Sequence, residues 1–422
     1  MAEGLKILLD GIGETDSHTL AVYEGRGGYQ GVRKALALTP LQVIDEVKKS
    51  NIRGRGGAGF PAGMKWSFVP RDTGKPVYLI CNADESEPGT FKDRLLLERN
   101  PHLIIEGMLI AAWAIGSKQS FIYIRGEYAY PYTRLQTAIR ECREKGYLGK
   151  GIFGSDFDHD IIVHRGAGAY VCGEESALLN SIEGRKGQPR LKPPFPAVSG
   201  LYACPTVINN VETLANMPWI MNNGGPAYAA IGVDKSAGTK LVSASGHIEK
   251  PGVYEVVMGY PLKKFIEDEC GGVWKGRKLK AVIPGGSSVH LLRADEIENV
   301  NLDYESLRLA GSSLGCAGFV VLDETTDMLQ VATNLSHFYA HESCGQCTPC
   351  REGGHWIHKI FERIAQGRGQ QGDLELIESV CSQIGGHTIC AFGDTMILPY
   401  LSIIRKFRAE LQERIAAAGG EH

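Results

Sequence analysis

The sequence lacks the features that mark membrane, secreted and nucleic-acid-binding proteins. It has no apolar run of about 18 residues or more, as a membrane-spanning helix needs, and its longest candidate, Leu103 to Ile115, is interrupted by Glu106. No basic segment leading into an apolar one follows Met1, so we expect neither a signal peptide nor a transit peptide. With 45 Lys and Arg against 48 Asp and Glu, the net charge of −3 is too balanced for electrostatic binding of nucleic acid. We therefore expect a globular cytoplasmic protein.

Among the residues that are present, glycine and cysteine stand out. Glycine accounts for 53 of the 422 residues, well above its average usage of about 7%. The 11 cysteines are unevenly placed, and in a reducing compartment clustered cysteines are metal ligands or redox groups more often than disulfides. At about 150 residues per domain, the length predicts two to four domains.

Hydrophobic periodicity predicts an α/β fold for the first half of the chain. Short apolar runs predict buried strands at residues 77–82, 120–125 and 160–164. Helices are expected at residues 39–51, 101–115 and 133–145, the first with Thr39 as its N-cap. Because strands and helices alternate, the sheet should be largely parallel. We assign this α/β domain, with an N-terminal helical segment, to residues 1–235.

The rest of the chain changes character twice. Between residues 239 and 323, short strands surround one helix that begins at Pro261, which predicts a small α+β unit. From Leu329 onward the pattern is helical, and it ends in an amphipathic helix over residues 395–418. We therefore expect two further domains, at residues 236–328 and 329–422.

A glycine-rich loop follows the first predicted helix. Residues 54–59 read Gly-Arg-Gly-Gly-Ala-Gly and satisfy the pattern G-x-G-x-x-G, which lets backbone amides approach a phosphate. The dinucleotide fingerprint must follow a strand, whereas a helix precedes this loop, so an ordinary dinucleotide site is disfavoured. Lys65 lies near enough along the chain to neutralise a phosphate. A phosphate-binding loop and a merely structural loop both remain open at this point.

Polar residues follow the first predicted strand. The stretch from Asn82 to Gly89 includes Asp84, Glu85 and Glu87, and ligands of α/β sheets bind at the carboxyl ends of strands. These groups could hydrogen-bond a ribose, a ribityl chain or a heterocycle. A solvated turn is the alternative.

A second glycine loop follows the third predicted strand. The stretch from His164 to Leu178 combines a strand end, a glycine turn and a helix start, which is the context of a phosphate or sugar site. Glu174 and Glu175 at the helix start equally fit simple capping of the helix dipole. Further on, Lys192 and Phe195 could clamp a phosphate and an adenine, or simply pack.

The strongest chemical signal is a run of cysteines near the C-terminus. Cys344, Cys347 and Cys350 form C-x2-C-x2-C, a spacing at which three thiolates can hold an iron–sulfur cluster. Zinc sites usually show two C-x2-C pairs, so zinc fits this run poorly. A [4Fe–4S] cluster needs a fourth ligand, for which Cys381 and Cys390 are the candidates. We favour Cys390, because it lies in a turn, whereas Cys381 lies in a helical pattern typical of a buried core residue.

Several stretches together closely resemble one family. From about Tyr29 to about Ala418, the chain is similar to the NADH-binding flavoprotein subunit of respiratory complex I, the NADH–quinone oxidoreductase. The stretches that carry the resemblance are Gly54 to Trp66, Asn82 to Gly89, Tyr170 to Leu178, Asn209 to Leu214, Glu342 to Gly353 and Ile389–Cys390. The resemblance implies a Rossmann-like α/β domain that binds FMN and NADH, a β-grasp domain of the SLBB type, and a C-terminal helical bundle that carries an iron–sulfur cluster.

The resemblance also implies roles for individual residues. The implied FMN contacts are Gly54, Arg55, Gly56, Gly57, Lys65, Asn82, Asp84, Glu85, Tyr170, Gly173, Glu174, Asn209, Asn210 and Thr213. The implied NADH contacts are Phe60, Phe68, Glu87, Glu175, Lys192 and Phe195, with Glu87 and Glu175 as the catalytic residues that face the nucleotide. The implied ligands of the [4Fe–4S] cluster are Cys344, Cys347, Cys350 and Cys390.

The implied activity is oxidation of NADH by FMN. A hydride would pass from NADH to FMN, and single electrons would pass to the cluster and onward to quinone. The implied partners are a thioredoxin-like [2Fe–2S] subunit and a large multi-cluster iron–sulfur subunit. Through them the chain would lie at the inner face of the bacterial cell membrane, with no nucleic-acid partner.

Two alternatives to this function remain. The first is the diaphorase subunit of an NAD-dependent hydrogenase or formate dehydrogenase, which shares the chemistry and differs in the final acceptor. Such relatives often carry an added domain before the flavin domain, whereas only 28 residues precede Tyr29, and we therefore favour the complex I subunit. The second is a nucleotide-binding scaffold without turnover, which would bind NADH without bleaching a flavin.

Overall fold

A parallel sheet organises the first part of the chain. The computed structural model describes residues 4–71 and 73–418. The sheet has the strand order β3-β2-β1-β4, and all of its strand pairs are parallel. Its strands are β1 (Tyr78–Ala83), β2 (Gln119–Ile124), β3 (Asp160–Arg165) and β4 (Thr206–Asn210). Because the strands are parallel, their carboxyl ends lie at one edge, where Asn82 of β1 is in register with Asn210 of β4.

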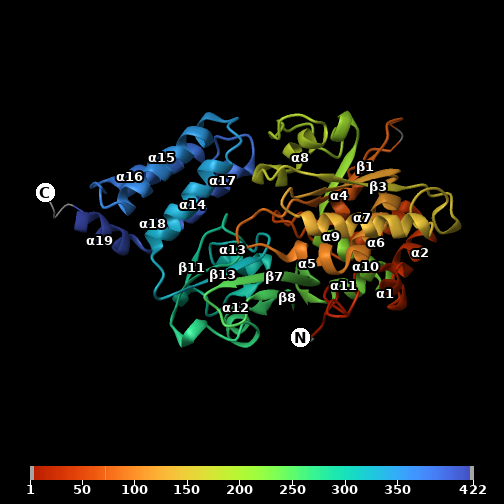
Figure 1. Ribbon diagram of the computed structural model, residues 1–422, viewed down its shortest axis with the longest axis horizontal. Coiled ribbons are helices and arrows are strands. Elements are labelled where there is room, and N and C mark those ends of the chain that lie inside the picture. The colour runs from red at the N-terminus through yellow and green to blue at the C-terminus, as the bar shows by residue number, and fades with distance from the viewer. Residues whose placement is uncertain (1–3, 72, 419–422) are drawn as a thin grey trace.

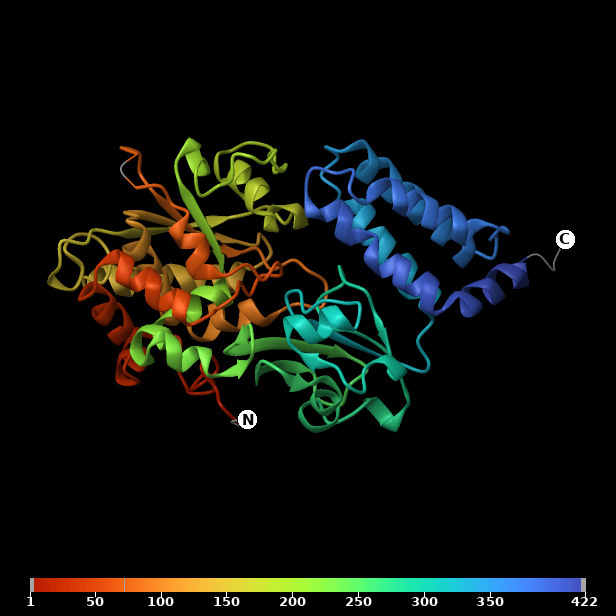
Figure 2. The same cartoon turned by 180° about the vertical axis from the view of Figure 1, so that it is seen from behind.

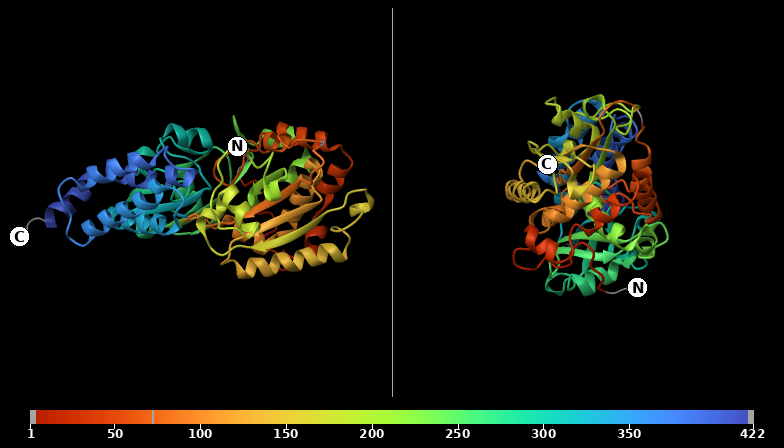
Figure 3. Two further views of the ribbon diagram at one scale, coloured as in Figure 1. Left: turned by 90° about the horizontal axis from the view of Figure 1, so that it is seen from above. Right: turned by 90° about the vertical axis from the view of Figure 1, so that its right-hand side faces the viewer.

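Helices lie on both sides of this sheet, as the view from above shows (Figure 3). The most central is α6, in which every residue except Trp113 is buried and which contacts β1 and β2. Its buried Glu106 accepts hydrogen bonds from the backbone amides of Tyr29 and Val32, at 2.8 and 3.1 Å, and so ties the N-terminal helices to the core. The helices of this first unit are α1 (Leu20–Gly25), α2 (Gln30–Leu36), α3 (Pro40–Lys49), α4 (Ala62–Ser67), α5 (Lys92–Arg99), α6 (Pro101–Ile115), α7 (Ala129–Glu144), α8 (Glu175–Ile182), α9 (Val211–Ala215), α10 (Met217–Asn223) and α11 (Gly225–Ala229).

A second, mixed sheet forms the middle unit, which extends from β5 to β13. Its strand order is β11-β10-β13-β7-β8, and only the β13–β7 pair is parallel. The core beneath it contains Val242, Phe265, Leu307 and Phe319. Two further pairs, β5–β6 and β9–β12, form small separate sheets. The strands of the whole unit are β5 (Gly232–Val233), β6 (Ser236–Ala237), β7 (Thr239–Gly246), β8 (Gly252–Val257), β9 (Tyr260–Pro261), β10 (Leu279–Ile283), β11 (Leu292–Arg293), β12 (Asn301–Leu302) and β13 (Gly318–Asp323), and its α-helices are α12 (Leu262–Lys264) and α13 (Tyr304–Leu309).

The C-terminal helices, α14 to α19, gather at one end of the molecule (Figures 1 and 2). They share a hydrophobic core with the middle sheet, because Ile283 and Leu322 pack in the same cluster as Leu329, Phe361 and Tyr400. The helices are α14 (Met328–Glu342), α15 (Thr348–Ala365), α16 (Asp373–Ile384), α17 (Ala391–Met396), α18 (Leu398–Lys406) and α19 (Arg408–Ala418).

Most predicted elements are confirmed, with two differences. Helix α7 begins at Ala129 rather than at residue 133, because Pro131 is tolerated in the first turn of a helix. The prediction of one helix over residues 395–418 is wrong, since α17, α18 and α19 cover this range. Pro399 explains the first break, because proline lacks the backbone N–H that would continue the preceding turn. Within the described ranges, no helix is long and apolar enough to cross a membrane.

Candidate functional site

A cavity of about 410 Å³ lies where the three parts of the chain meet. The first unit contributes the glycine-rich loop, the carboxyl ends of β1 and β4, and the turn before α8. The middle unit contributes residues from two loops, Gly285 to Val289 and Ser313 to Cys316, and the C-terminal helices contribute Ala391, Phe392 and Thr395. The volume lies within the range of about 300–1,000 Å³ that is typical of small-molecule sites.

Most of the residues predicted to contact FMN line this cavity. They are Gly56, Gly57, Asn82, Asp84, Glu85, Tyr170, Gly173, Glu174 and Asn210, and Glu87 of the predicted NADH set joins them. The remaining predicted residues lie outside this lining and are Gly54, Arg55, Lys65, Asn209 and Thr213 of the FMN set and Phe60, Phe68, Glu175, Lys192 and Phe195 of the NADH set.

The alternation of side chains along β4 explains why Asn209 and Asn210 point in different directions. Successive side chains of a strand point to opposite faces, so Asn210 lines the cavity while Asn209 faces Trp66, whose indole Nε1 donates to its Oδ1 at 2.8 Å. Asn210 caps α9 by accepting from the Glu212 amide at 2.9 Å. It also donates to Asp93 at 2.6 Å, which fixes its orientation at the cavity.

The glycine-rich loop is supported from the protein interior. The Arg55 amide donates to the Thr213 hydroxyl at 2.9 Å, and the fully buried Arg55 guanidinium donates to the Ala237 carbonyl at 2.6 Å. The Arg55 side chain therefore points away from the cavity. A Cβ on Gly56 would lie 2.9 Å from the Cβ of Asn210, so this close approach requires glycine.

Asp84 is a half-buried residue whose carboxyl group has one buried, unsatisfied oxygen. Its Oδ2 is buried and has no hydrogen-bond partner among the described residues. Burial raises the pKa of Asp84 to about 8, and the neighbouring Arg125 lowers it only in part. Asn82 beside it donates to the Gly173 carbonyl at 2.9 Å, which joins the two segments that flank the cavity. An unpaired buried oxygen beside a cavity is available for a hydrogen bond from a ligand or an ordered water molecule.

Glu87 is held by Tyr170, which was predicted as an FMN contact, and by two serines that no sequence pattern singled out. Its carboxylate accepts from the Tyr170 hydroxyl at 2.6 Å, from the Ser287 hydroxyl at 3.1 Å and from the Ser288 amide at 2.8 Å. The two serines belong to the middle unit, in a loop that has the sequence of a simple turn. A Cβ on Gly286, which has a φ of 97°, would lie 2.6 Å from the Cγ of Glu87, so only glycine fits here.

Lys92 and Asp93 also line the cavity without having been predicted. Lys92 is 1% exposed, and its ammonium lies 2.7 Å from Asp93 and 2.9 Å from Glu212. The Glu85 carboxylate caps the start of α5 by accepting from the Asp93 and Arg94 amides at 2.8 and 2.9 Å. The proximity of these two residues to the acidic strand end was the signal that could have identified them.

A chain of ion pairs connects several predicted nucleotide contacts. Lys65 lies 3.1 Å from Glu175, and Lys192 lies 2.9 Å from Glu175 and 3.0 Å from Glu174. Glu174 also caps α8 by accepting from the Ser176 amide at 2.9 Å. The structure therefore brings the two lysines and the two glutamates together in one cluster, in which each ammonium has a carboxylate partner.

The three predicted phenylalanines are exposed. The exposed fractions are 48% for Phe60, 53% for Phe68 and 59% for Phe195. The ring centroids of Phe60 and Phe68 are 6.1 Å apart. Exposed aromatic rings are available to a flat ligand, because their faces are not used in the core.

A second, smaller cavity is lined by four cysteines. They are Cys344, Cys347, Cys350 and Cys390, whereas Cys381 is fully buried in the core of the C-terminal helices. Among the residues that the structure describes, no three His, Cys, Asp or Glu side chains lie close enough together to hold a single metal ion. The four thiols line one cavity, as the cysteine ligands of an iron–sulfur cluster would.

The two cavities are neighbours. Val171 and Phe392 line both of them. The cysteine cavity also has hydrogen-bond donors at its sulfur atoms, since the Ile389 amide donates to Cys347 at 3.3 Å and the Ser343 hydroxyl lies 3.2 Å from the Cys350 sulfur. Such hydrogen bonds tune the reduction potential of an iron–sulfur cluster.

The residues around both cavities fit a flavin mononucleotide and an iron–sulfur cluster. Apart from Gly57 itself and its two chain neighbours, no atom of the described residues lies within 4 Å of the position that a Cβ on Gly57 would take, so the loop backbone is open to a ligand. The orphaned Asp84 oxygen fits a ribityl hydroxyl, which would donate to it. The four thiols fit the cysteine ligation that [4Fe–4S] clusters require.

Asp84 should make the stability of the FMN-free protein depend on pH. Because its folded pKa of about 8 lies above the ordinary value of 3.8, the unfolded chain releases this proton first, and stability falls as the pH rises from about 4 to about 8. Asp84→Asn is therefore expected to raise the unfolding midpoint at pH 8 more than at pH 5. Thermal unfolding followed by circular dichroism would measure this, with the exposed Asp156→Asn as the matched control. An equal effect of both variants at pH 8 would contradict the burial of Asp84.

Comparison with known families explains this combination of cavities. Residues 47–219 match the family model of the Nuo51 FMN-binding domain, residues 240–331 match the SLBB domain, and residues 330–414 match the NADH-ubiquinone oxidoreductase-F iron-sulfur binding region. The chain is 53% identical over 410 residues to F subunit 2 of the NADH-quinone oxidoreductase of Rhizobium meliloti (strain 1021), covering 97% of both chains. This chain belongs to the family of NADH-quinone oxidoreductase F subunits. As a member, it is an oxidoreductase subunit with FMN and one [4Fe–4S] cluster as cofactors and NADH as substrate.

Other relatives agree with this assignment. The chain is 51% identical over 406 residues to the NADH-quinone oxidoreductase F subunit of Streptomyces coelicolor (strain ATCC BAA-471 / A3(2) / M145), covering 96% of this chain and 90% of the relative. Among solved structures, NAD+-reducing [NiFe]-hydrogenase in the air-oxidized state matches with a TM-score of 0.84 and 36% identity, covering 97% of this chain and 67% of that one. The chain and this hydrogenase thus share the fold.

Proposed function

We propose that this chain is the electron-input subunit of a proton-pumping NADH–quinone oxidoreductase. The observation that carries the proposal is the pair of adjacent cavities, which share Val171 and Phe392 as a common wall. Bound FMN supplies a ring that accepts a hydride and releases electrons singly, and a bound [4Fe–4S] cluster accepts one electron at a time. The chain itself positions both groups and controls access to them.

In this proposal, the residues around the first cavity divide into two groups. The FMN contacts are Gly54, Arg55, Gly56, Gly57, Lys65, Asn82, Asp84, Glu85, Tyr170, Gly173, Glu174, Asn209, Asn210 and Thr213. The NADH contacts are Phe60, Phe68, Glu87, Glu175, Lys192 and Phe195. The cluster ligands are Cys344, Cys347, Cys350 and Cys390. Arg55, Asn209 and Thr213 would act through the backbone or by holding their neighbours, since their side chains face inward.

Charge explains how the proposed NADH site selects its ligand. Lys192 would neutralise a phosphate group of the nucleotide, and the aromatic rings would grip the adenine. Glu87 and Glu175 would accept hydrogen bonds from the nicotinamide side and the ribose. Their negative charge would repel the extra phosphate of NADPH, which favours NADH.

We also propose three domains with the boundaries expected from the sequence. A Rossmann-like FMN- and NADH-binding domain covers residues 1–235, a β-grasp domain residues 236–328 and a helical cluster-binding domain residues 329–422. The parallel sheet β1–β4, the mixed sheet of the middle unit and the helices α14–α19 support this division.

Membership among the F subunits implies a complex with other subunits. We propose that the partners are a thioredoxin-like [2Fe–2S] subunit and a large multi-cluster iron–sulfur subunit. Electrons that reach a single cluster need such onward acceptors. Through these partners, the chain would lie peripherally at the inner face of the bacterial cell membrane.

NADH is expected to bleach the flavin absorption band of the FMN-loaded chain, whereas NAD+ should not. Lys192→Gln should raise the KM for NADH about tenfold with little change in kcat, because it removes binding shared by the ground and transition states. Lys186→Gln, an exposed neighbouring lysine, is the matched control. A chain that binds no flavin in excess FMN would disprove the proposed function.

A second candidate function follows from the hydrogenase match, with its TM-score of 0.84. The chain would then be the diaphorase subunit of an NAD-dependent hydrogenase or formate dehydrogenase. The identity of 36% to that chain is lower than the 53% to the Rhizobium meliloti relative, so this candidate is less well supported. Co-purification separates the two: a membrane arm with NADH–quinone reductase activity supports complex I, and hydrogen- or formate-dependent reduction of NAD+ supports the alternative.

A further inference from the structure

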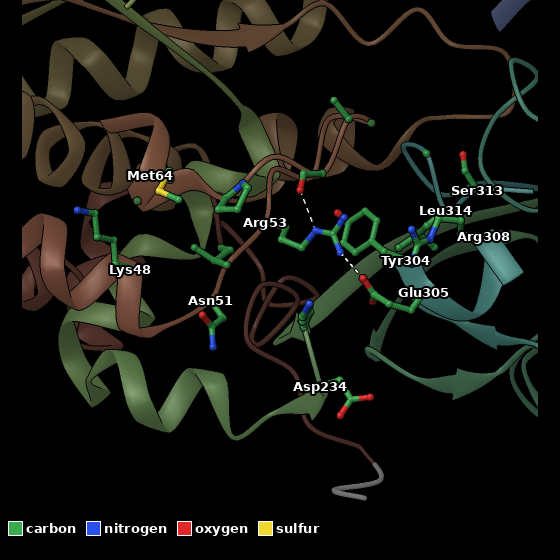
Figure 4. A pocket seen from close by; sticks show the side chains of 18 of the residues that line it. Lys48, Asn51, Arg53, Met64, Asp234, Tyr304, Glu305, Arg308, Ser313 and Leu314 are labelled. Carbon is green, nitrogen blue, oxygen red and sulfur yellow. Dashed lines mark hydrogen bonds and ion pairs between the residues drawn. The ribbon is translucent and has the colours of Figure 1, made fainter. Parts of the chain in front are cut away.

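The glycine-rich loop is held from outside by the middle unit. A cleft of about 1,260 Å³, part of whose lining is drawn in Figure 4, opens beside the cavity proposed for FMN, the flavin cavity. Gly57 and Ala58 line both spaces. The loop therefore separates the flavin cavity from the cleft. Helix α13 of the middle unit supplies Tyr304, Glu305 and Arg308 to the cleft.

Arg53 joins the loop to this helix. Its Nε donates to the Gly59 carbonyl at 2.8 Å, and its Nη1 donates to Glu305 at 2.6 Å, as the dashed lines in Figure 4 mark. Its guanidinium also lies 3.9 Å from the ring centroid of Tyr304. Because Arg53 precedes the loop and bonds to its far end, one side chain spans the whole turn.

Tyr304 contacts the same loop directly. Its hydroxyl donates to the Gly54 carbonyl at 2.8 Å. Its ring packs on the loop so closely that a Cβ on Gly59 would lie 2.9 Å from the Tyr304 Cε1. Ser236 in turn holds the start of the helix, since its hydroxyl donates to Glu305 at 2.6 Å and accepts from the Tyr304 amide at 3.2 Å.

We infer that Arg53, Tyr304 and Glu305, the loop clamp, are positioning residues that hold the glycine-rich loop in its FMN-binding conformation. The SLBB domain thereby takes part in flavin retention. Residues 54–59 include four glycines, which lose much conformational freedom when they are ordered. A loop that is already held leaves less of this entropy to be lost on binding, so FMN binds more tightly. The inference rests on the proposed function, because it assumes that FMN occupies the cavity.

Titration of the FMN-free full chain with FMN, followed by quenching of flavin fluorescence, tests the clamp. Arg53→Met should weaken FMN binding about tenfold or more, and Tyr304→Phe about threefold to tenfold, as expected for lost buried hydrogen bonds. Arg308→Met is the matched control, because Arg308 lies on the same helix and in the same cleft, yet its side chain makes no hydrogen bond or ion pair with any residue in the described part of the chain. This control should bind FMN as the unmodified chain does.

Two further measurements separate positioning from general stability. The double variant Arg53→Met/Glu305→Leu should bind FMN no more weakly than Arg53→Met alone, because the two residues act as one unit. The cluster EPR signal and kcat per bound FMN should not change, since the clamp touches neither the cysteines nor the nucleotide.

The outcomes distinguish the clamp from the proposed function. If the unmodified chain binds no FMN, both the proposed function and the clamp are wrong. If it binds FMN and all clamp variants bind equally well, only the clamp is wrong. Should Arg53→Met fail to fold, Tyr304→Phe removes a single oxygen atom and must still weaken FMN binding, or the inference is overturned.

Discussion

Replacing Cys390 with alanine is expected to abolish the EPR signal of the reduced [4Fe–4S] cluster and to lower the iron content of the purified protein. Cys390 lines the same cavity as the cysteine triplet, and a cube-shaped cluster with only three thiolates loses one iron ligand. NADH–ferricyanide activity should survive in part, because the flavin cavity keeps most of its lining. EPR spectroscopy of the reduced protein, together with iron analysis, measures the effect.

Cys381→Ala provides the matched control for this experiment. Cys381 is fully buried in α16 and packs in the core of the C-terminal helices. Its replacement should lower stability modestly through the lost packing, by about 1 kcal/mol, and should leave the cluster signal intact. The reverse result, with the signal lost in Cys381→Ala and kept in Cys390→Ala, would show that the fourth ligand is wrongly assigned.

Glu212→Gln is expected to destabilise the protein by about 3–5 kcal/mol, as the loss of one partner from a buried ion pair does. Glu212 is fully buried, and its Oε2 lies 2.5 Å from the Lys240 ammonium and 2.9 Å from that of Lys92. Burial alone would raise the pKa of Glu212, but Lys240, Lys92 and Arg55 outweigh it and lower the pKa to about 2. Without this carboxylate, three buried cations lose a shared counter-charge.

The stability of this variant should also depend on pH in a defined way. Because the folded pKa of Glu212 lies below its ordinary value of 4.5, its stabilising contribution is present above about pH 4.5 and is lost as the pH falls toward 2. The difference in free energy of unfolding between the variant and the unmodified chain should therefore become smaller at acidic pH. Chemical unfolding at pH 7 and at about pH 3 would measure both effects.

Glu298→Gln is the control for the buried charge cluster. Glu298 is 66% exposed and pairs with Lys263 at 2.8 Å, so its loss should cost less than about 1 kcal/mol. If Glu212→Gln unfolds at the same denaturant concentration as Glu298→Gln, the buried charge cluster contributes no more to the stability of the protein than a surface ion pair does. Such a result would contradict the stabilising role of Glu212.

Local patterns predicted the elements well. The strands β1, β2 and β3 lie within a residue or so of the predicted apolar runs, and the predicted helix 101–115 coincides with α6. Local chemistry also located the N-cap Thr39, whose hydroxyl accepts from the Gln42 amide at 3.3 Å. These features depend on residues close in the sequence, which periodicity and capping rules describe.

Long-range contacts could not be predicted in the same way. The hydrogen bonds from Ser287 and Ser288 to Glu87 join segments about two hundred residues apart, and no local pattern predicts them. The inward direction of Arg55 likewise depends on Tyr228 and Ala237, which fold against the loop from another part of the chain.

By itself, the sequence determined the order of strands and helices, the glycine-rich loops, the cysteine triplet and the resemblance to the flavoprotein subunit of complex I. These are properties of residue type and spacing along the chain. Only the tertiary structure decided that Cys390 lies beside the triplet, that Asn210 rather than Asn209 lines the flavin cavity, and that the middle unit clamps the loop. The physical reason is that packing between distant segments selects which side chains meet, and this selection depends on the whole core rather than on any local pattern.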